Sequence, residues 1–283
     1  MAIRSILAPI SGYEVDSVAL ASGMRLARRL GAYVDVIHVQ PDPKDMVPPL
    51  TINDIGSIME RAISEVTKDI EARAGRAKLL YEEACKGAKF ITSGPGAQAS
   101  FRILGGRSAD ALPVMARVSD LILFSRVPEA VEAEWRLTLE ALLLESGRPV
   151  LLMPKAPVEP IGDSVAVAWN GSVEAAHAAS AALPLLGLAR RVLLLSGSKG
   201  APLEPSLDDV GVWLERHGVL AERKHVRLKA WPIGEQLVDE AANEGADLLV
   251  MGAYGHTRMR ETIFGGATRA VLNECRLPVL LAH

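Results

Sequence analysis

The sequence repeats itself, and this repetition constrains the fold more than any other feature of the chain. A strand-like segment in the first half, SDLILF (Ser119–Phe124), is matched by ADLLVM (Ala246–Met251) in the second half. RPVLLMP (Arg148–Pro154) is matched in the same way by LPVLLAH (Leu277–His283). The second copies follow the first in the same order and after nearly the same number of residues. This regularity indicates two homologous units rather than chance similarity.

A proline-rich connector separates the two units. The segment PKAPVEPIGD, Pro154–Asp163, combines three prolines with a glycine, which is typical of a stiff and exposed linker. We therefore predict a first domain at residues 1–154, a linker at residues 155–162 and a second domain at residues 163–283. Both domains then have an ordinary size.

Strand-like and helix-like patterns alternate within each unit. In the second half, the apolar run SVAVAW precedes the helical spacing of VEAAHAASAALPLL, and RRVLLLSGS is again strand-like. The first half follows the same order and includes one long helical segment from about residue 52 to residue 86. This alternation predicts two tandem α/β domains, each with a doubly wound, Rossmann-like parallel sheet. Ligands of such sheets bind beyond the carboxyl ends of the strands.

Composition excludes several classes of function. The formal net charge of −3 gives no reason to expect nucleic-acid or membrane binding. No apolar run reaches the length of a membrane helix, and the N-terminal residues resemble a first strand rather than a signal peptide. Cys85 and Cys275 form no metal-binding or redox motif, so we expect no metal and a reduced, cytoplasmic location.

A glycine-containing loop follows the strand-like segment of the second half. The stretch MGAYGHTRMRETIFGGATRAVL has glycines at 252, 255, 265 and 266, the last two just before a helical pattern. It is neither a Walker A loop nor a dinucleotide fingerprint. Glycines allow close backbone approach, and a helix N-terminus favours an anion. The residues alone leave open both a phosphate site and a structural turn.

No catalytic constellation is visible along the chain. The sequence contains no GxSxG nucleophile elbow, and no pair of carboxylates stands apart in an apolar context. The six histidines are scattered without metal-ligand spacing. We therefore expect no catalytic residues, although slow phosphohydrolase activity is left open.

The second half resembles the universal stress protein family, whose nucleotide-binding members carry G-x2-G-x9-G-[ST] after this strand. The resemblance implies that ATP, or another adenine nucleotide, binds here, with the phosphates in the glycine loop. It also implies adenosine contacts in AWNGS, which stands where the family has a V-D-G-S-like motif. Asn170 replaces the usual Asp, and Gly266 replaces the usual Ser or Thr. The implied nucleotide-binding residues are Asn170, Gly171, Ser172, Gly252, Gly255, Gly265, Gly266 and Thr268.

The first half departs much further from the family pattern. After SDLILF there is no glycine until Gly147, and Glu129, Glu132 and Glu134 add negative charge to the region. We therefore predict that the first domain has a degenerate nucleotide site and a structural role. The resemblance further implies that the closing strands, PVLLM and PVLLA, join the halves as an intramolecular pseudo-dimer. Homo-oligomers through sheet edges are left open.

Two functions remain after these steps. The first is a non-enzymatic stress-response or regulatory protein that binds an adenine nucleotide in its C-terminal half. The alternative is a protein-interaction module in which both nucleotide sites have decayed, with an unknown protein partner.

Overall fold

The computed structural model describes residues 2–47, 56–92, 94, 98–126, 132–197, 204–226, 233–253 and 276–283. Contacts within the chain separate a first unit, Arg4–Ser146, from a second unit that contains Gly147–His283. The linker that the sequence places at residues 155–162 stays a prediction. No helix among the described residues is both long and apolar enough to span a bilayer.

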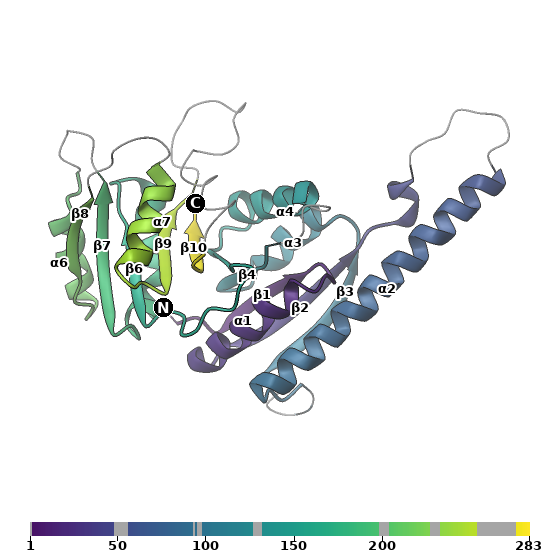
Figure 1. The fold of residues 1–283 in the computed structure, drawn as a ribbon, viewed down its shortest axis with the longest axis horizontal. Coiled ribbons are helices and arrows are strands. Elements are labelled where there is room, and N and C mark those ends of the chain that lie inside the picture. The colour runs from purple at the N-terminus through teal and green to yellow at the C-terminus, as the bar shows by residue number, and fades with distance from the viewer. Residues whose placement is uncertain are drawn as a thin grey trace. The chain divides into compact units, whose positions relative to one another are not determined.

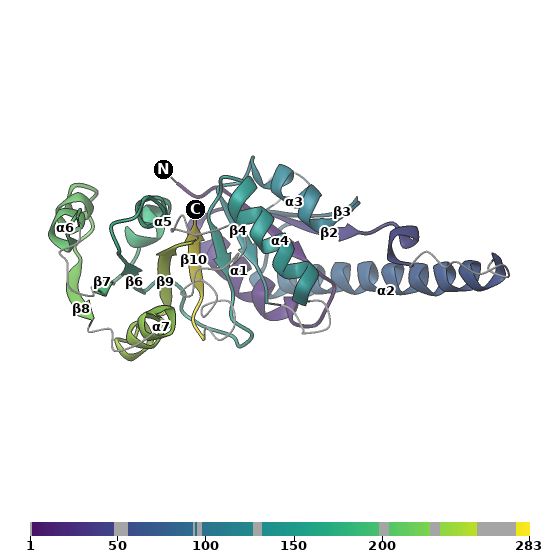
Figure 2. The same ribbon diagram turned by 90° about the horizontal axis from the view of Figure 1, so that it is seen from above.

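The first unit is an α/β domain with a parallel sheet in the order β3-β2-β1-β4. Helices α1 and α2 pack against each other, as do α3 and α4, and the two pairs cover opposite faces of the sheet (Figure 2). Its elements are β1 (Ser5–Ile10), α1 (Asp16–Leu30), β2 (Tyr33–Gln40), η1 (Pro43–Met46), α2 (Gly56–Ala88), β3 (Ala99–Gly105), α3 (Ser108–Ala116), β4 (Leu121–Phe124) and α4 (Glu132–Glu145).

The second unit has a mixed sheet in the order β5-β10-β9-β6-β7-β8, in which only β5 is antiparallel to its neighbour β10. Helix α5 covers one face and α7 the other (Figure 2), and α7 lies in front of the sheet in Figure 1. Its elements are β5 (Val150–Leu152), β6 (Ser164–Ala168), α5 (Val173–Leu186), β7 (Arg191–Gly197), α6 (Leu207–Arg216), β8 (Glu222–Val226), α7 (Ile233–Asn243), β9 (Leu248–Gly252) and β10 (Val279–Ala282).

These elements confirm the predicted α/β class and the strand–helix alternation of both halves. The segment VEAAHAASAALPLL forms α5 over its whole length, and the long helical segment of the first half forms α2. Strands β6, β7 and β9 are buried almost throughout, because helices cover both faces of a parallel sheet. The two repeated closing segments also pair with each other, Leu280 opposite Leu151.

An aspartate of the repeated motif ties two strands together in each unit. In the first unit, Asp120 accepts hydrogen bonds from the amides of Arg4 and Ser5, at 2.8 and 3.0 Å. In the second, Asp247 accepts from the amides of Gly162, Asp163 and Ser164. These amides lie at the starts of β1 and β6. The duplicated SDL and ADL segments therefore preserve a carboxylate that satisfies them.

We expect Asp247→Ala to lower the free energy of unfolding by about 2 kcal/mol, because several amides lose a charged acceptor. Urea denaturation followed by far-UV circular dichroism measures this change. Asp239, exposed on α7, provides the matched control, and Asp239→Ala should change stability by less than about 0.5 kcal/mol. Equal effects of the two substitutions would contradict the role of Asp247.

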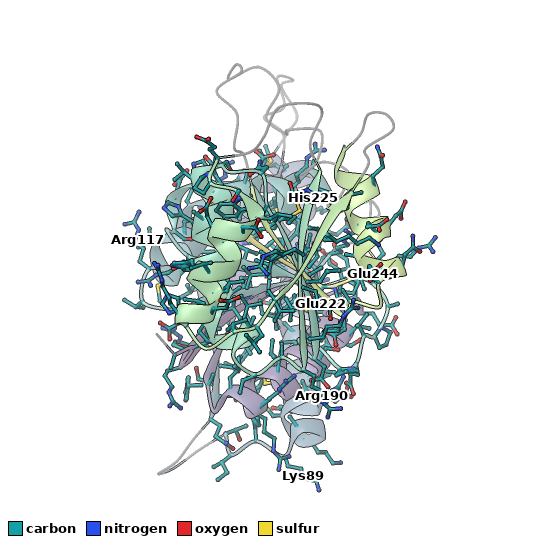
Figure 3. The ribbon with its side chains drawn as sticks, turned by 90° about the vertical axis from the view of Figure 1, so that its left-hand side faces the viewer. Lys89, Arg117, Arg190, Glu222, His225 and Glu244 are labelled. Carbon is teal, nitrogen blue, oxygen red and sulfur yellow. The ribbon has the colours of Figure 1, made fainter. Side chains whose placement is uncertain are left out.

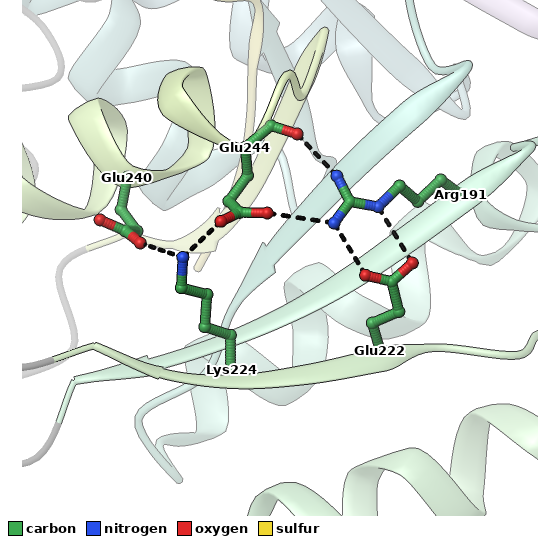
Figure 4. Close-up of polar contacts among 5 residues, drawn as sticks. All are labelled: Arg191, Glu222, Lys224, Glu240 and Glu244. Carbon is green, nitrogen blue, oxygen red and sulfur yellow. Dashed lines mark hydrogen bonds and ion pairs between the residues drawn. The ribbon is translucent and has the colours of Figure 1, made fainter.

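Ion pairs fasten the edge strand β8 to its neighbours (Figure 4). Arg191 of β7 makes a bidentate contact with Glu222 of β8, at 3.0 and 2.7 Å, and also contacts Glu244. Lys224 of β8 reaches Glu240 and Glu244 from the same side. The hydrogen bond from Arg191 lowers the pKa of Glu222, and that from Lys224 lowers the pKa of Glu244.

Strand β8, at the edge of the sheet, therefore carries charged side chains along its length. Glu222 and His225 of β8, with Glu244 close by, are visible in Figure 3. Charges on an edge strand oppose pairing with another chain. Self-association through β8 is accordingly disfavoured.

Candidate functional site

The loop between β6 and α5 holds three of the residues that the sequence implicates. Asn170 is exposed, and its Oδ1 accepts a hydrogen bond from the amide of Ser172 at 3.1 Å. Ser172 in turn caps α5, since its hydroxyl accepts from the amide of Ala175 at 3.1 Å. Two consecutive side-chain contacts thus fix the turn and orient the start of the helix.

Gly171 has to be glycine at this turn. Its φ of +76° lies in the left-handed region, which side chains with a Cβ rarely adopt. A Cβ there would also lie 3.0 Å from the carbonyl oxygen of Glu204, in the segment that precedes α6. Trp169 reaches the same segment, because its indole N–H donates to the carbonyl of Pro205 at 2.8 Å. Trp169 is therefore buried against this segment, and its ring does not form an open surface on which a nucleotide base could stack.

Gly252, at the end of β9, lies against the first turn of α5. A Cβ at this position would approach the amide nitrogen of Ala175 to 2.6 Å and the carbonyl carbon of Glu174 to 2.7 Å. Strands β6 and β9 are neighbours in parallel register, Val167 opposite Val250, so both end at the same edge of the sheet. The structure thus brings Gly252 together with the loop of Asn170, Gly171 and Ser172.

Hydrogen bonds hold Ala253 in place where the chain leaves β9. The amide of Ala253, which is fully buried, donates to the carbonyl of Ala282 at 2.8 Å. His283 Nδ1 donates to the carbonyl of Ala253 at 3.2 Å, and His177 Nδ1 donates to that of His283 at 3.1 Å. These two histidines join α5, β10 and the start of the glycine loop. Their spacing along the sequence gave no signal of this role.

Four of the predicted nucleotide-binding residues lie outside the described part of the chain: Gly255, Gly265, Gly266 and Thr268. Their contribution stays a prediction. Within the described residues, the electrostatics of this edge are mixed. The N-terminus of α5 carries a partial positive charge, whereas Glu174 in its first turn carries a negative one. No group of three or more His, Cys, Asp or Glu among the described residues is arranged to hold a metal.

Sequence reasoning missed one buried polar group at the same edge. Ser196 lies near the end of β7 and is 1% exposed, and its hydroxyl has no hydrogen-bond partner among the described residues. In register, Ser196 is opposite the position of Trp169, because Ala168 pairs with Leu195. A serine inside an apolar strand pattern carries no signal that distinguishes it from a packed residue.

The register of the strands identifies the equivalent edge of the first unit. Ile6 pairs with Leu121 in the first unit as Val165 pairs with Leu248 in the second. Counting from these pairs, Gly12 corresponds to Gly171 and Ser125 to Gly252. Ser11 and Gly12 therefore take the places of Asn170 and Gly171.

A buried carboxylate occupies this edge in the first unit. Asp16 Oδ2 accepts from the amides of Ser11 and Gly12, at 2.8 and 2.9 Å, and from the Ser11 hydroxyl. Its Oδ1 accepts from the hydroxyl of Ser125 at 2.7 Å. Burial raises the pKa of Asp16, although these hydrogen bonds oppose the shift. The turn amides are thus already occupied by a side chain.

Comparison with known proteins relates the second unit to one family. A family model described as the universal stress protein family matches residues 163–283. A universal stress protein of Methanocaldococcus jannaschii is 36% identical over 47 residues, which cover 17% of this chain and 29% of that protein. The match therefore spans less than a third of that relative's length.

Solved structures resemble the chain over nearly all of its length. A universal stress protein from Archaeoglobus fulgidus DSM 4304 aligns with a TM-score of 0.70 at 15% identity, covering 98% of this chain and 95% of its own. A structure from Pseudomonas aeruginosa UCBPP-PA14 aligns with a TM-score of 0.56 at 16% identity, covering 99% and 93%. At such identities the likeness concerns the fold, here two tandem α/β units.

Proposed function

Since the model of the universal stress protein family matches residues 163–283, we propose that the second unit binds an adenine nucleotide and that ATP is the first ligand to test. The protein would act as a non-enzymatic regulatory protein in a stress response. The observation that carries this proposal is the spacing of Gly252, Gly255 and Gly265 after the end of β9. Parallel α/β sheets bind ligands at this edge.

The described contacts support distinct roles for the residues of the site. Gly252 brings the start of the glycine loop against the N-terminus of α5, where a partial positive charge favours phosphate. Asn170 is exposed and uses its Oδ1 to hold the turn, which leaves its amide nitrogen as a donor toward the adenosine. Gly255, Gly265, Gly266 and Thr268 would supply backbone and hydroxyl donors to the phosphates.

Glu174 works against tight phosphate binding. Its backbone lies within van der Waals distance of Gly252, and its carboxylate is part of the first turn of α5. A negative charge at this place opposes an anionic ligand. Because the side chain is partly exposed, water and salt reduce the effect.

Isothermal titration of the full chain with ATP tests the proposal. We expect saturable binding that weakens by at least about tenfold in Gly255→Val combined with Gly265→Val, because bulky side chains block backbone approach to phosphate. Glu174→Gln should strengthen binding by about twofold at low salt. Gly105→Val is the control, since a Cβ at Gly105 meets nothing within 4 Å. No heat of binding, or equal affinity of the glycine variants, would contradict the proposal.

The alternative is a protein-interaction module with decayed nucleotide sites. Asn170 and Gly266 replace residues that the nucleotide-binding members of the family carry, and Glu174 is unfavourable for phosphate. Under this alternative, the purified protein contains no nucleotide by mass spectrometry, and ATP leaves its thermal midpoint unchanged. A nucleotide in the purified protein would instead support the first function.

A further inference from the structure

Strand β3 forms an edge of the sheet in the first unit and lies beside α2 (Figure 1). It pairs in parallel with β2. At the start of β3, the amide of Val34 donates to the carbonyl of Gln98 at 2.9 Å, and at its end the amide of Gly106 donates to the carbonyl of Gln40 at 2.9 Å. Backbone groups of successive strand residues point to alternate sides, so the even-numbered residues from 98 to 106 face β2.

The odd-numbered residues of β3 turn their backbone groups away from β2. The first of them is Ala99, and its carbonyl already accepts a hydrogen bond from the Tyr81 hydroxyl of α2 at 3.2 Å. The N–H and C=O groups of Phe101, Ile103 and Gly105 face no strand among the described residues. The outer edge of β3 therefore offers three residues, evenly spaced about Ile103, for pairing with another strand.

The side chains of β3 protect this edge less than those of β8 protect the other. Arg102 is the one charged residue of β3, and its Nη2 lies 3.5 Å from Asp35 Oδ1 on β2, so its charge is held over the sheet. On the opposite face, the ring of Phe101 stacks on that of Tyr81 with centroids 5.6 Å apart. Ile103 is on the same face as Phe101 and is 47% exposed. An edge strand with an exposed apolar centre and a single charge is suited to strand pairing.

A groove between β3 and α2 continues this surface onto the helix. Leu79 lies three residues before Glu82, on the same flank of α2, and is 59% exposed. Lys78 is on this flank too, with its Nζ 4.0 Å from Glu82 Oε1. The flank therefore combines an apolar side chain with charges of both signs. Residues that line the groove include Tyr81, Glu82, Lys86, Phe90 and Phe101.

We propose that this edge binds a second copy of the chain, with β3 of one protomer antiparallel to β3 of the other about a two-fold axis at Ile103. In this register Ile103 is opposite its own counterpart, and Phe101 is opposite Gly105 of the other protomer. These are the residues whose backbone groups point outward, so each pair exchanges two hydrogen bonds. All the free backbone groups of the three residues are then used in both copies.

Charge selects this register over its neighbour. A two-fold axis at Arg102 would place two guanidinium groups directly opposite each other, in the closer kind of cross-strand pair. It would also require the carbonyl of Ala99, which Tyr81 already occupies. With the axis at Ile103, Arg102 is instead opposite Leu104 of the other protomer.

The position of α2 favours a second copy over an isolated peptide strand. Helix α2 contacts both β2 and β3. Because strands are spaced by about 4.8 Å, two such helices related by the axis lie about 10 Å apart, which is a normal distance between packed helices. A second copy thus covers Leu79 and the groove as well as the strand, whereas a peptide strand covers the edge alone. This interface lies in the first unit and does not rest on nucleotide binding by the second.

Sedimentation of the full chain, from about 1 to about 200 µM, tests the interface. One short strand and one helix flank from each copy bury on the order of 1,000 Å², the lower limit for a specific dimer, so we expect a dissociation constant on the order of 10 µM. Ile103→Lys should weaken the dimer at least about tenfold, because two ammonium groups then meet at the axis. Val118→Lys is the matched control, since Val118 is 81% exposed elsewhere in the first unit. It should leave the dissociation constant unchanged.

Disulfide cross-linking tests the register independently. Ile103→Cys should form a covalent dimer on mild oxidation, because the Cα atoms of such a pair are about 5.5 Å apart, within the range that a disulfide spans. Arg102→Cys should cross-link to Leu104→Cys in a mixture of the two variants, and much more slowly to itself. The parent chain under the same oxidant controls for Cys85 and Cys275.

Circular dichroism verifies that each variant is folded. The proposal is overturned if the parent stays monomeric over the whole concentration range, or if Ile103→Lys dimerises as tightly as the parent. It is also overturned if Arg102→Cys cross-links to itself as readily as Ile103→Cys does.

Discussion

Replacing Gly252 with alanine is expected to lower the free energy of unfolding of the second unit by about 3 kcal/mol. The added Cβ would lie 2.6 Å from the amide nitrogen of Ala175 and 2.7 Å from the carbonyl carbon of Glu174. Both atoms belong to helix backbone, so the clash cannot be relieved by turning a flexible side chain. Strand β9 and helix α5 have to move apart, which disturbs a tightly packed layer.

Urea denaturation measures the loss, and hydrogen exchange of α5 and β9 assigns it to the second unit. Gly75→Ala is the matched control. Gly75 lies within α2, where an added Cβ meets nothing within 4 Å. The same substitution there should stabilise the protein by about 0.5–1 kcal/mol, because alanine is the better helix former. Similar effects at the two positions would show that Gly252 is not a packing requirement.

The packing of Gly252 against α5 changes how the glycine spacing is interpreted. From the sequence, Gly252 is the first residue of a phosphate-binding loop. In the structure, its small size is also needed for the contact between β9 and α5. Sequence spacing cannot separate these two needs, because both select glycine. Loss of ATP binding in a Gly252 variant would therefore be ambiguous, which is why the nucleotide test uses Gly255 and Gly265.

Much of the fold follows from the sequence because it depends on local patterns and on repetition. Helical spacing predicted α5, and the matched PVLL segments predicted β5 and β10. Asn170, Gly171, Ser172 and Gly252 lie at one edge of the sheet, as expected for residues that directly follow neighbouring parallel strands, and their binding of a nucleotide stays a prediction. The resemblance to a family supplied their functional interpretation.

What the sequence did not reveal depends on contacts between distant segments. Asp16 meets Ser125, and Arg73 shares a cavity with His38 and Glu134. A carboxylate near the start of a helix is normally interpreted as a solvated first-turn residue. An arginine within a long amphipathic helix is interpreted as surface. Only the packing of α2 and α4 around the ends of β1 and β2 distinguishes these residues from their neighbours.

Asp16→Ala is expected to lower the free energy of unfolding of the first unit by about 2–4 kcal/mol. The substitution removes the acceptor for the amides of Ser11 and Gly12 and for the Ser125 hydroxyl, in a position where Asp16 is fully buried. Asp16→Asn should cost less, because its oxygen can still accept from the two amides and its nitrogen can donate to Ser125. Asp110→Asn is the control, since that side chain is 72% exposed. Urea denaturation at pH 7 compares the three variants.

The pH dependence separates the charge of Asp16 from its hydrogen bonds. Burial raises the pKa of Asp16 above its value in the unfolded chain, so the native state holds this proton to a higher pH. The contribution of Asp16 to the free energy of unfolding is therefore greatest below its pKa in the unfolded chain, about 3.9. This contribution falls as the pH rises through the pKa of Asp16 in the native state. Measured from about pH 4 to pH 7, the parent should lose stability relative to Asp16→Asn, which does not titrate there. If the parent instead gains stability over this range, the hydrogen bonds lower the pKa of Asp16 by more than burial raises it. The charged carboxylate would then stabilise the turn.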